Sequence, residues 1–204
     1  MLQSKRSAIG RDITPELLGP SDYEALAEHL SRQSAESDRF GVADHLPFSG
    51  ASDAQDPGLR ARRLSQWGRA LNETGWQRTW AVRAGRAGSI TGHLDLTGPE
   101  LKAELHRARV SLGVESAHRR RSVGERLLRE AIAFARDAGL AWLDLWVFAH
   151  NAPALALYRK VGFVEIGRFP DQFRTRQMSI DDIAMAFRLD PHLPHGVFST
   201  VSPQ

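Results

Sequence analysis

Apolar residues recur along the chain at two different spacings, and these spacings divide it into regions. Near the N-terminus, apolar residues three and four positions apart predict a helix that Ser21 and Asp22 can cap. The same spacing predicts a second helix from Leu59 to Leu71. Between these helices, residues 41–58 are rich in Gly, Pro, Ser and Asp, a composition typical of a loop.

Short apolar runs separated by turn residues follow the second helix. The turn signals are Ala84-Gly85 and Gly98-Pro99. The strands expected around them are Thr79–Arg83, Ser89–Leu96 and Leu105–Val114. Short strands divided by turns indicate an antiparallel meander.

The rest of the pattern alternates between helix and strand. A helix is predicted from Ser122 to Ala138, and Gly139 can end it. Trp142–Phe148 is almost continuously apolar, which is typical of a central strand covered on both faces. The remaining elements are a short helix over Asn151–Lys160 with Pro153 in its first turn and Gly162 at its end, and strands over Phe163–Arg168 and about Gln177–Leu189.

This order predicts a single α/β domain over residues 1–190, with helices flanking one mixed central sheet. Residues 191–204 contain three prolines and little periodicity, so we expect a loosely held C-terminal tail there. A length of 204 residues with 42% hydrophobic residues suits one domain with a substantial core.

The composition excludes several chemistries. The chain has no cysteine, which rules out disulfides, cysteine metal ligands and an acyl-cysteine intermediate, and we expect no metal. Met1–Gly10 has no apolar run, and no window approaches the roughly 20 apolar residues of a membrane span, so we expect a cytoplasmic protein without a membrane partner. The net charge of +3 is too small by itself to indicate nucleic acid.

A candidate anion site follows the strand that ends at Val114. The segment Arg119-Arg120-Arg121-Ser122-Val123-Gly124-Glu125 is an arginine-rich turn that leads into an amphipathic helix. The first amides of a helix have no internal partners, so together with the helix dipole and the arginines they can bind phosphate oxygens. A solvated basic turn with Ser122 as an ordinary N-cap is the alternative. Rossmann and P-loop sites are not supported, because their glycine motifs are absent.

A second motif lies about thirty residues later, in the segment from Asn151 to Phe163. The pattern R-x-x-[G/S]-x-G, then a helix and a strand, then N-x-x-A-x-x-L-Y-x-K-x-G-F resembles the GNAT acetyltransferase superfamily. The resemblance covers Leu112 to Phe163. It implies a single GNAT-like α/β domain that uses acetyl-CoA as acyl donor and transfers an acetyl group directly to a primary amine.

The resemblance also implies roles for individual residues. The edge Leu112-Gly113-Val114 would bind the pantetheine arm where the fourth strand splays from the fifth, and an amide near Val114 could polarise the thioester carbonyl. The turn from Arg119 to Glu125 would hold the pyrophosphate. Asn151 would contact the cofactor arm, and Tyr158 would protonate the departing thiolate. Asn151 can equally be a helix N-cap, and Tyr158 a half-buried aromatic.

Two positions depart from the family pattern. Ser122 replaces the first glycine of the phosphate turn. Trp146 stands where the branch that acetylates ribosomal-protein N-termini has a glutamate base, and this tryptophan can line an acceptor groove or lie in the core. Another base, or a water chain, must therefore remove the proton of the acceptor amine. The candidates we select for this base are Glu104 and His106. Glu104 begins the predicted strand that ends at Val114, which is the fourth strand of the family's sheet, and His106 lies two residues further on, so both are expected on one face. The other candidates are Asp95, His93 and His150.

The acceptor is expected to be a small-molecule amine or a peptide N-terminus. Asp181-Asp182 can attract a cationic amine, although an exposed strand start explains them equally well. A non-catalytic acyl-CoA-binding or regulatory module is the alternative to an enzyme, because the base is missing. We expect no nucleic-acid partner, since Arg119–Arg121 lie at one helix start without a long basic face. Edge strands and exposed tryptophans in this architecture allow a homodimer.

Overall fold

The computed structural model describes residues 13–40, 56–85, 88–174 and 179–189, and within them the strands form one mixed sheet. The strands are β1 (Glu16–Leu17), β2 (Gln77–Arg83), β3 (Ile90–Thr97), β4 (Arg107–Val114), β5 (Trp142–Phe148), β6 (Val164–Arg174) and β7 (Ser179–Arg188). Their order across the sheet is β1-β2-β3-β4-β5-β7-β6. Among the described strands, β4 and β5 are the one pair that runs parallel, and the other neighbours are antiparallel. The predicted meander and mixed sheet are confirmed.

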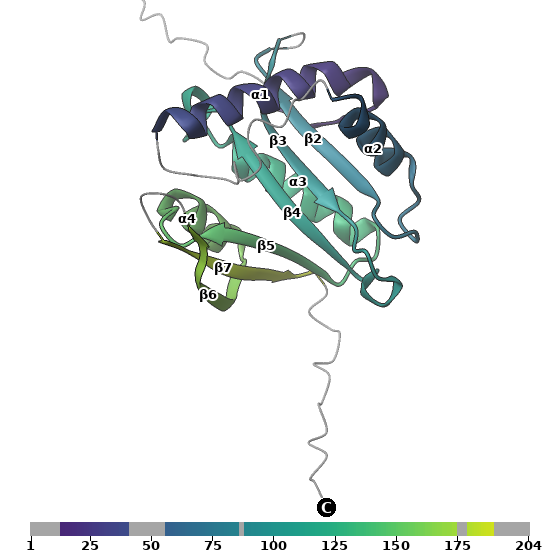
Figure 1. Cartoon of the computed structure of the whole chain (residues 1–204). Helices are drawn as coiled ribbons and strands as arrows, with labels where there is room; N and C mark the ends of the chain where they lie inside the picture. Colours follow the sequence, from purple (N-terminus) through teal and green to yellow (C-terminus); the bar gives the residue numbers. More distant parts are fainter. Residues whose placement is uncertain (1–12, 41–55, 86–87, 175–178, 190–204) are drawn as a thin grey trace, which may run out of the picture.

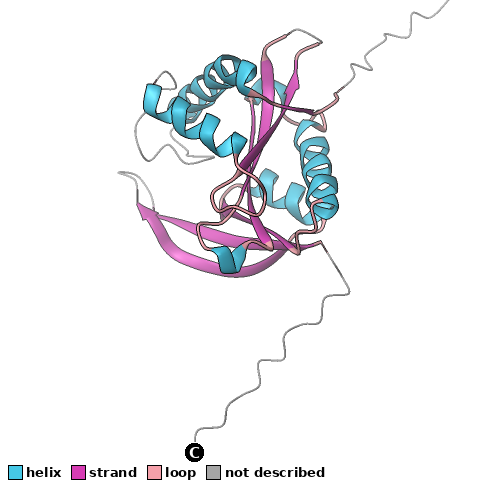
Figure 2. Ribbon diagram, turned by 90° about the vertical axis from the view of Figure 1, so that its right-hand side faces the viewer, coloured by secondary structure: helices cyan, strands magenta, loops and turns pink. Residues whose placement is uncertain are grey.

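Helices cover the two faces of this sheet unequally. Helices α1 (Tyr23–Phe40) and α2 (Pro57–Gly68) lie on one face, and α3 (Val123–Asp137) lies on the other (Figures 1 and 2). The short helix α4 (Ala152–Val161) follows β5. Because α1 and α2 contact β2 and β3, and α1 reaches only the C-terminal end of β4, they leave the same face of β5, β7 and the first part of β4 without a helix above it.

The main core lies between the sheet and α3. The apolar spacing of this helix predicts a stripe of Val123, Leu127, Leu128, Ala131, Ala135 and Ala138, and all of these are buried except Ala138, the half-buried C-cap; Ile132 is buried beside them. Trp80 of β2 and Trp76, which precedes that strand, are also core residues. Each fully buried leucine contributes about 1.5–3 kcal/mol relative to exposure, so this stripe fixes the start of α3 against β4. None of the described helices is long and apolar enough to cross a membrane.

Strands β4 and β5 pair only at one end. Their register joins Arg107–Arg109 to Trp142–Asp144, and no pair joins them beyond that point. The rest of β4 pairs with β3 alone, and the rest of β5 pairs with β7 alone. Figure 1 shows the two strands diverging toward their C-terminal ends. The facing edges therefore carry backbone N–H and C=O groups that no strand partner uses.

Three predicted details are wrong. Glu104 does not lie on the fourth strand: it is in a short 3-10 helix, Lys102–Glu104, and β4 begins at Arg107, where its pairing with β5 starts. His106 precedes the strand as well, so the expected shared strand face does not exist. Strand β5 is not covered on both faces, because Trp146 is 44% exposed. The loop predicted over 41–58 lies mostly outside the described residues, as does the tail from 191 to 204.

Candidate functional site

The predicted anion-binding turn leads directly into α3. Arg126 N–H donates to the carbonyl of Ser122, which closes the first turn of the helix. The amides of Val123, Gly124 and Glu125 precede that bond, so they have no partner within the helix. Ser122 occupies the N-cap position but its side chain makes no capping hydrogen bond. The ordinary-cap interpretation of Ser122 is therefore wrong, and the helix start keeps its donors for another acceptor.

The backbone of the same turn is held in an unusual conformation. Arg120 and Ser122 both have positive φ angles, 59° and 63°. Left-handed residues of this kind cost about 1–2 kcal/mol when they carry a Cβ. Arg119 Nε donates to the carbonyl of Val114 at 3.1 Å, and this bond ties the turn to the end of β4. The side chains of Arg120 and Arg121 are exposed at the turn.

Gly124 lets three elements meet at the start of α3. A Cβ at this position would lie 3.0 Å from Leu157 Cδ2 of α4 and 3.4 Å from Leu112 Cδ2 of β4. The glycine therefore permits α3, α4 and the diverging edge of β4 to approach closely. In this way the fold brings the two sequence motifs together.

Tyr158 of α4 is buried in the core beside Phe163, with ring centroids 5.9 Å apart. Burial raises the pKa of the Tyr158 phenol to about 12. The phenol therefore stays protonated at neutral pH and can act only as a proton donor there. Asn151 caps α4, because its Oδ1 accepts from Ala154 N–H at 3.2 Å. The capping alternative for Asn151 is thus confirmed, and it does not exclude a second contact.

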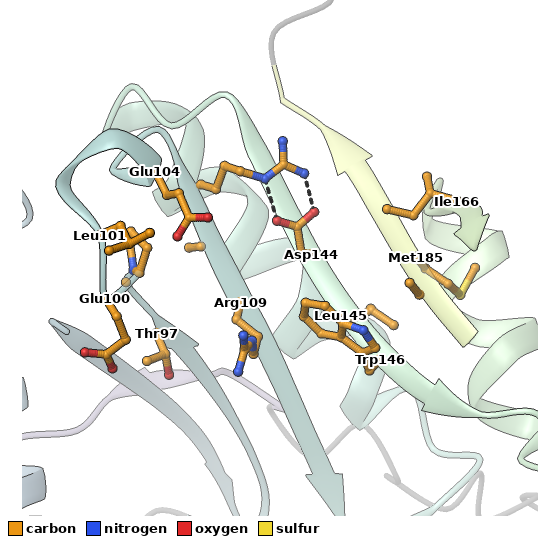
Figure 3. Close-up of a pocket in the computed structure, with 15 residues that line it drawn as sticks. Thr97, Glu100, Leu101, Glu104, Arg109, Asp144, Leu145, Trp146, Ile166 and Met185 are labelled. Carbon is orange, nitrogen blue, oxygen red and sulfur yellow. Dashed lines mark hydrogen bonds and ion pairs between the residues drawn. The ribbon is translucent and has the colours of Figure 1, made fainter. Parts of the chain in front are cut away.

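A cavity of about 490 Å³ opens on the part of the sheet that α1 and α2 leave uncovered, next to the point where β4 and β5 part (Figure 3). It is lined by Thr97, Gly98, Pro99, Glu100, Leu101, Glu104, Arg107, Ala108, Arg109, Asp144, Leu145, Trp146, Ile166, Ala184 and Met185. Its volume falls within the range of small-molecule sites, roughly 300–1,000 Å³. Of the two interpretations of Trp146, the cavity lining is the one that the structure supports.

The predicted base candidates do not gather at one point. Glu104 is exposed at the edge of the cavity, whereas His106 is exposed and absent from the cavity lining. Asp95 is buried, and its Oδ1 accepts hydrogen bonds from Thr79 Oγ1 at 2.5 Å and from Arg63 Nη1 at 3.1 Å. Burial alone would raise the pKa of Asp95, but Arg63, His93 and Thr79 outweigh it and hold that pKa below its usual range.

His93 belongs to a buried chain of hydrogen bonds that sequence reasoning missed. Its Nδ1 lies 3.0 Å from Nε2 of His29 on α1, and His29 Nδ1 lies 2.8 Å from Glu115 Oε1. Burial is the main reason why the pKa of His29 is lowered, although Glu115 opposes the shift. The chain links α1 to β3 and to the residue after β4. Because His29 and His93 are 64 residues apart, no local pattern could have paired them.

The remaining predicted residues lie near the open end of β5. His150 stacks on Phe148, with ring centroids 5.6 Å apart. Asp181 holds Arg168 at 2.8 Å on the surface. Asp182 is only 6% exposed, and its Oδ1 has no hydrogen-bond partner among the described residues. The exposed strand start expected for the two aspartates is therefore wrong for Asp182, whose pKa burial raises.

Comparison with known proteins agrees with this geometry. The chain matches the model of the acetyltransferase (GNAT) family over residues 45–163. It is 38% identical over 90 residues to N-alpha-acetyltransferase RimI of Mycobacterium tuberculosis, and 32% identical over 100 residues to L-amino acid N-acetyltransferase AaaT of Escherichia coli. These matches cover 42% and 43% of this chain and only 52% and 59% of the two relatives.

Solved structures share the whole fold. YncA from Salmonella typhimurium, solved with its cofactor acetyl-CoA, aligns with a TM-score of 0.71 at 18% identity, covering 91% of this chain and 99% of that one. A GNAT-family acetyltransferase from Streptococcus pneumoniae aligns with a TM-score of 0.68 at 24% identity, covering 85% and 97%. Identities this low establish the fold alone. Since the family model spans more than half of the residues and the sheet has the same architecture, the chain belongs to the acetyltransferase (GNAT) family.

Proposed function

We propose that the protein is an N-acetyltransferase that moves an acetyl group from acetyl-CoA directly to a primary amine while both substrates are bound. The observation that carries this proposal is the parting of β4 from β5 beside the start of α3, where Gly124 meets Leu112 of β4 and Leu157, the residue before Tyr158 in α4. The family match and the relatives named as N-acetyltransferases support it.

The residues at the parted strands fit an acyl-CoA donor. The edge Leu112-Gly113-Val114 offers backbone groups without a β5 partner, as a pantetheine arm requires. The first amides of α3 and the exposed side chains of Arg119–Arg121 suit a pyrophosphate, because a helix start and guanidinium groups both favour phosphate oxygens. Glu125 is held by Lys160 and Arg129, so its negative charge is offset at this site. Asn151, at the start of α4, is proposed to contact the arm.

The transfer needs one proton donated and one removed. The amine nitrogen attacks the thioester carbon, and the bond from that carbon to sulfur breaks. Tyr158 gives its phenolic proton to the sulfur, and a protonated phenol is available because the pKa of Tyr158 is about 12. An amide near Val114 can stabilise the developing oxyanion. Glu104, at the cavity edge, is the proposed acceptor for the proton of the amine; His106, outside the cavity lining, is the weaker candidate.

Holding both substrates in one groove supplies the orientation that aminolysis lacks in water. Thiol release from acetyl-CoA, measured with a panel of amines, tests the proposal. The panel includes peptide N-termini, lysine peptides, amino acids, polyamines and aminoglycosides. Amine-dependent thiol release with an acetylated product is the expected result.

A non-catalytic acyl-CoA-binding module is the alternative, and the tryptophan at position 146 in place of a glutamate favours it. Tight binding of acetyl-CoA without thiol release for any amine would support that module. No binding of acetyl-CoA at all would contradict both functions. Calorimetry of acetyl-CoA binding, run on the same preparation as the amine panel, separates these outcomes.

A further inference from the structure

The charged groups around the cavity divide into two sides. Strands β4 and β5 supply Arg107, Arg109 and Asp144, whereas the segment that connects β3 to β4 supplies Glu100 and Glu104 (Figure 3). Arg107 binds Asp144 with two hydrogen bonds, Nε to Oδ2 at 2.7 Å and Nη2 to Oδ1 at 2.5 Å. This pair neutralises itself. The positive charge that the strand side offers to a ligand therefore belongs to Arg109.

Arg109 is positioned by an aromatic ring rather than by a carboxylate. Its guanidinium carbon lies 4.7 Å from the centroid of the Trp146 ring on the neighbouring strand. Within the described residues, no hydrogen bond or ion pair is made by the Arg109 side chain, and this side chain is exposed. A cation–π contact uses none of the five N–H donors of a guanidinium as hydrogen bonds. Arg109 is therefore held in place with its donors available.

The location of Arg109 relates it to the acyl group. Arg109 is the last residue of β4 that pairs with β5, where its partner is Asp144. The edges part immediately after it, and the proposed function puts the thioester end of the donor along those edges. A ligand group bound at Arg109 would hold the rest of that ligand beside the parting strands. The position suits the fixed end of an acceptor, not its reacting nitrogen, because a guanidinium repels an ammonium group.

We infer that the acceptor is a small amine with a carboxylate close to its amino group, as in an α-amino acid, and that Arg109 binds this carboxylate. The inference rests on the proposed function. Trp146 orients the guanidinium of Arg109, and the apolar side chains of Leu101, Ile166 and Met185 face the remainder of the acceptor. A peptide N-terminus or a polyamine lacks the neighbouring carboxylate and would leave Arg109 unpaired.

Glu100 and Glu104 complete a dipolar cavity. Both lie on the side away from Trp146, and their carboxylates attract the ammonium form of a zwitterion. The same two charges disfavour an acceptor with a second negative group. A zwitterion with one carboxylate therefore matches both sides of the cavity, whereas a polycation matches only one.

The test compares each of a panel of L-amino acids with its own amide, because the pair has the same side chain and amino group and the amide lacks the carboxylate charge. A charge-assisted hydrogen bond predicts that kcat/KM favours the acid over the amide by about tenfold to a hundredfold. Arg109→Gln should bring this ratio close to one, and Arg109→Lys should leave an intermediate ratio. Arg60→Gln is the matched control: Arg60 is an exposed arginine of α2 that pairs with Glu24, and its loss should leave the ratio unchanged.

Direct binding makes the result independent of turnover. Calorimetry of the amino acid and its amide, titrated into the protein saturated with CoA, should show the same preference for the acid, lost in Arg109→Gln. Equal or tighter binding of amides, peptides or polyamines, unchanged by Arg109→Gln, would overturn the inference even if the enzyme is active. Preferential binding of amino acids without any acetyl transfer would instead contradict the proposed function and leave the acceptor site standing. Thermal melting of each variant identifies a folding defect.

Discussion

Gly113 lies on the edge of β4 beneath α1, and replacing it with alanine tests how tightly this edge is packed. A Cβ at this position would lie 2.4 Å from Gln33 Oε1, 2.5 Å from Gln33 Nε2 and 2.7 Å from His93 Cε1. Gln33 and His93 are 3% and 5% exposed, so neither can move into solvent without opening the helix–sheet interface. Gly113→Ala therefore forces α1 away from the sheet, and because His29 lies on α1 this movement breaks the hydrogen bond between His93 and His29.

The expected loss in stability follows from these contacts. Overpacking a filled interior costs about 1–3 kcal/mol, and the broken hydrogen bond costs about 1 kcal/mol more. Replacing glycine by alanine in a strand returns about 0.5–1 kcal/mol. The free energy of unfolding of Gly113→Ala should therefore fall by about 1–3.5 kcal/mol, which lowers Tm by roughly 2–14 °C for a chain of this length.

Urea unfolding and thermal melting provide the measurement, and Gly167→Ala provides the control. No atom lies within 4 Å of a Cβ at Gly167, so that substitution should be neutral or slightly stabilising. Gln33→Ala removes one of the two obstructing side chains, so it should reduce the cost of Gly113→Ala in a double-mutant cycle. Equal stability of Gly113→Ala and Gly167→Ala would refute the packing described for the edge of β4.

Three further predictions concern strain and protonation. Ser122→Gly should raise the free energy of unfolding by about 0.5–1 kcal/mol, because glycine relieves the positive φ of 63° at a modest entropic cost; unchanged or lower stability would contradict the strain. Because the pKa of His29 is lower in the folded protein, the unfolded chain binds more protons than the folded chain in this pH range. The contribution of neutral His29 to stability is therefore present above about pH 6.5 and is lost as the pH falls through the pKa of the folded state. His29→Gln should flatten this part of the stability curve measured by urea unfolding, with Glu115, Arg32 and His93 as the ionisable neighbours; an unchanged slope would refute it. Because the pKa of Tyr158 is about 12, kcat should show no alkaline loss from phenol ionisation below about pH 11, and such a loss near pH 10, absent in Tyr158→Phe, would contradict the burial of the phenol.

Local sequence patterns predicted most of the elements because periodicity and end signals act over a few residues. Gly139 and Gly162 end their helices with φ angles of 71° and 114°, as a residue without a Cβ can do readily. The predicted start of β4 was wrong because the strand begins where Arg107 pairs with Trp142, which lies more than thirty residues later in the sequence. Strand β1 has only two residues, too short for any alternating pattern.

The parts of the candidate site that lie within the two local motifs could be predicted from the sequence. The parts that depend on contacts between distant segments of the chain could not. The turn from Arg119 to Glu125 and the helix with Tyr158 could be identified from their sequences. The exposure of Trp146 could not be predicted from the sequence, because the apolar pattern of its strand does not show that α1 and α2 leave β5 uncovered. One signal was available in the sequence. Arg109 and Trp146 belong to two strands that were expected to be neighbours, and side chains two residues apart on a strand share a face of the sheet, so a contact between the two residues was possible.

The proposed acetyl transfer uses Tyr158 as general acid, and a comparison of Tyr158→Phe with the wild type tests this role. The measurement is thiol release at saturating acetyl-CoA and amine, together with the Kd of acetyl-CoA. Tyr23→Phe serves as control because Tyr23 is the other tyrosine of the chain, buried on α1. Tyr158→Phe should lower kcat by about 10²–10⁴-fold, whereas the Kd of acetyl-CoA should stay within about threefold of the wild-type value. A kcat like that of Tyr23→Phe would contradict the role of Tyr158.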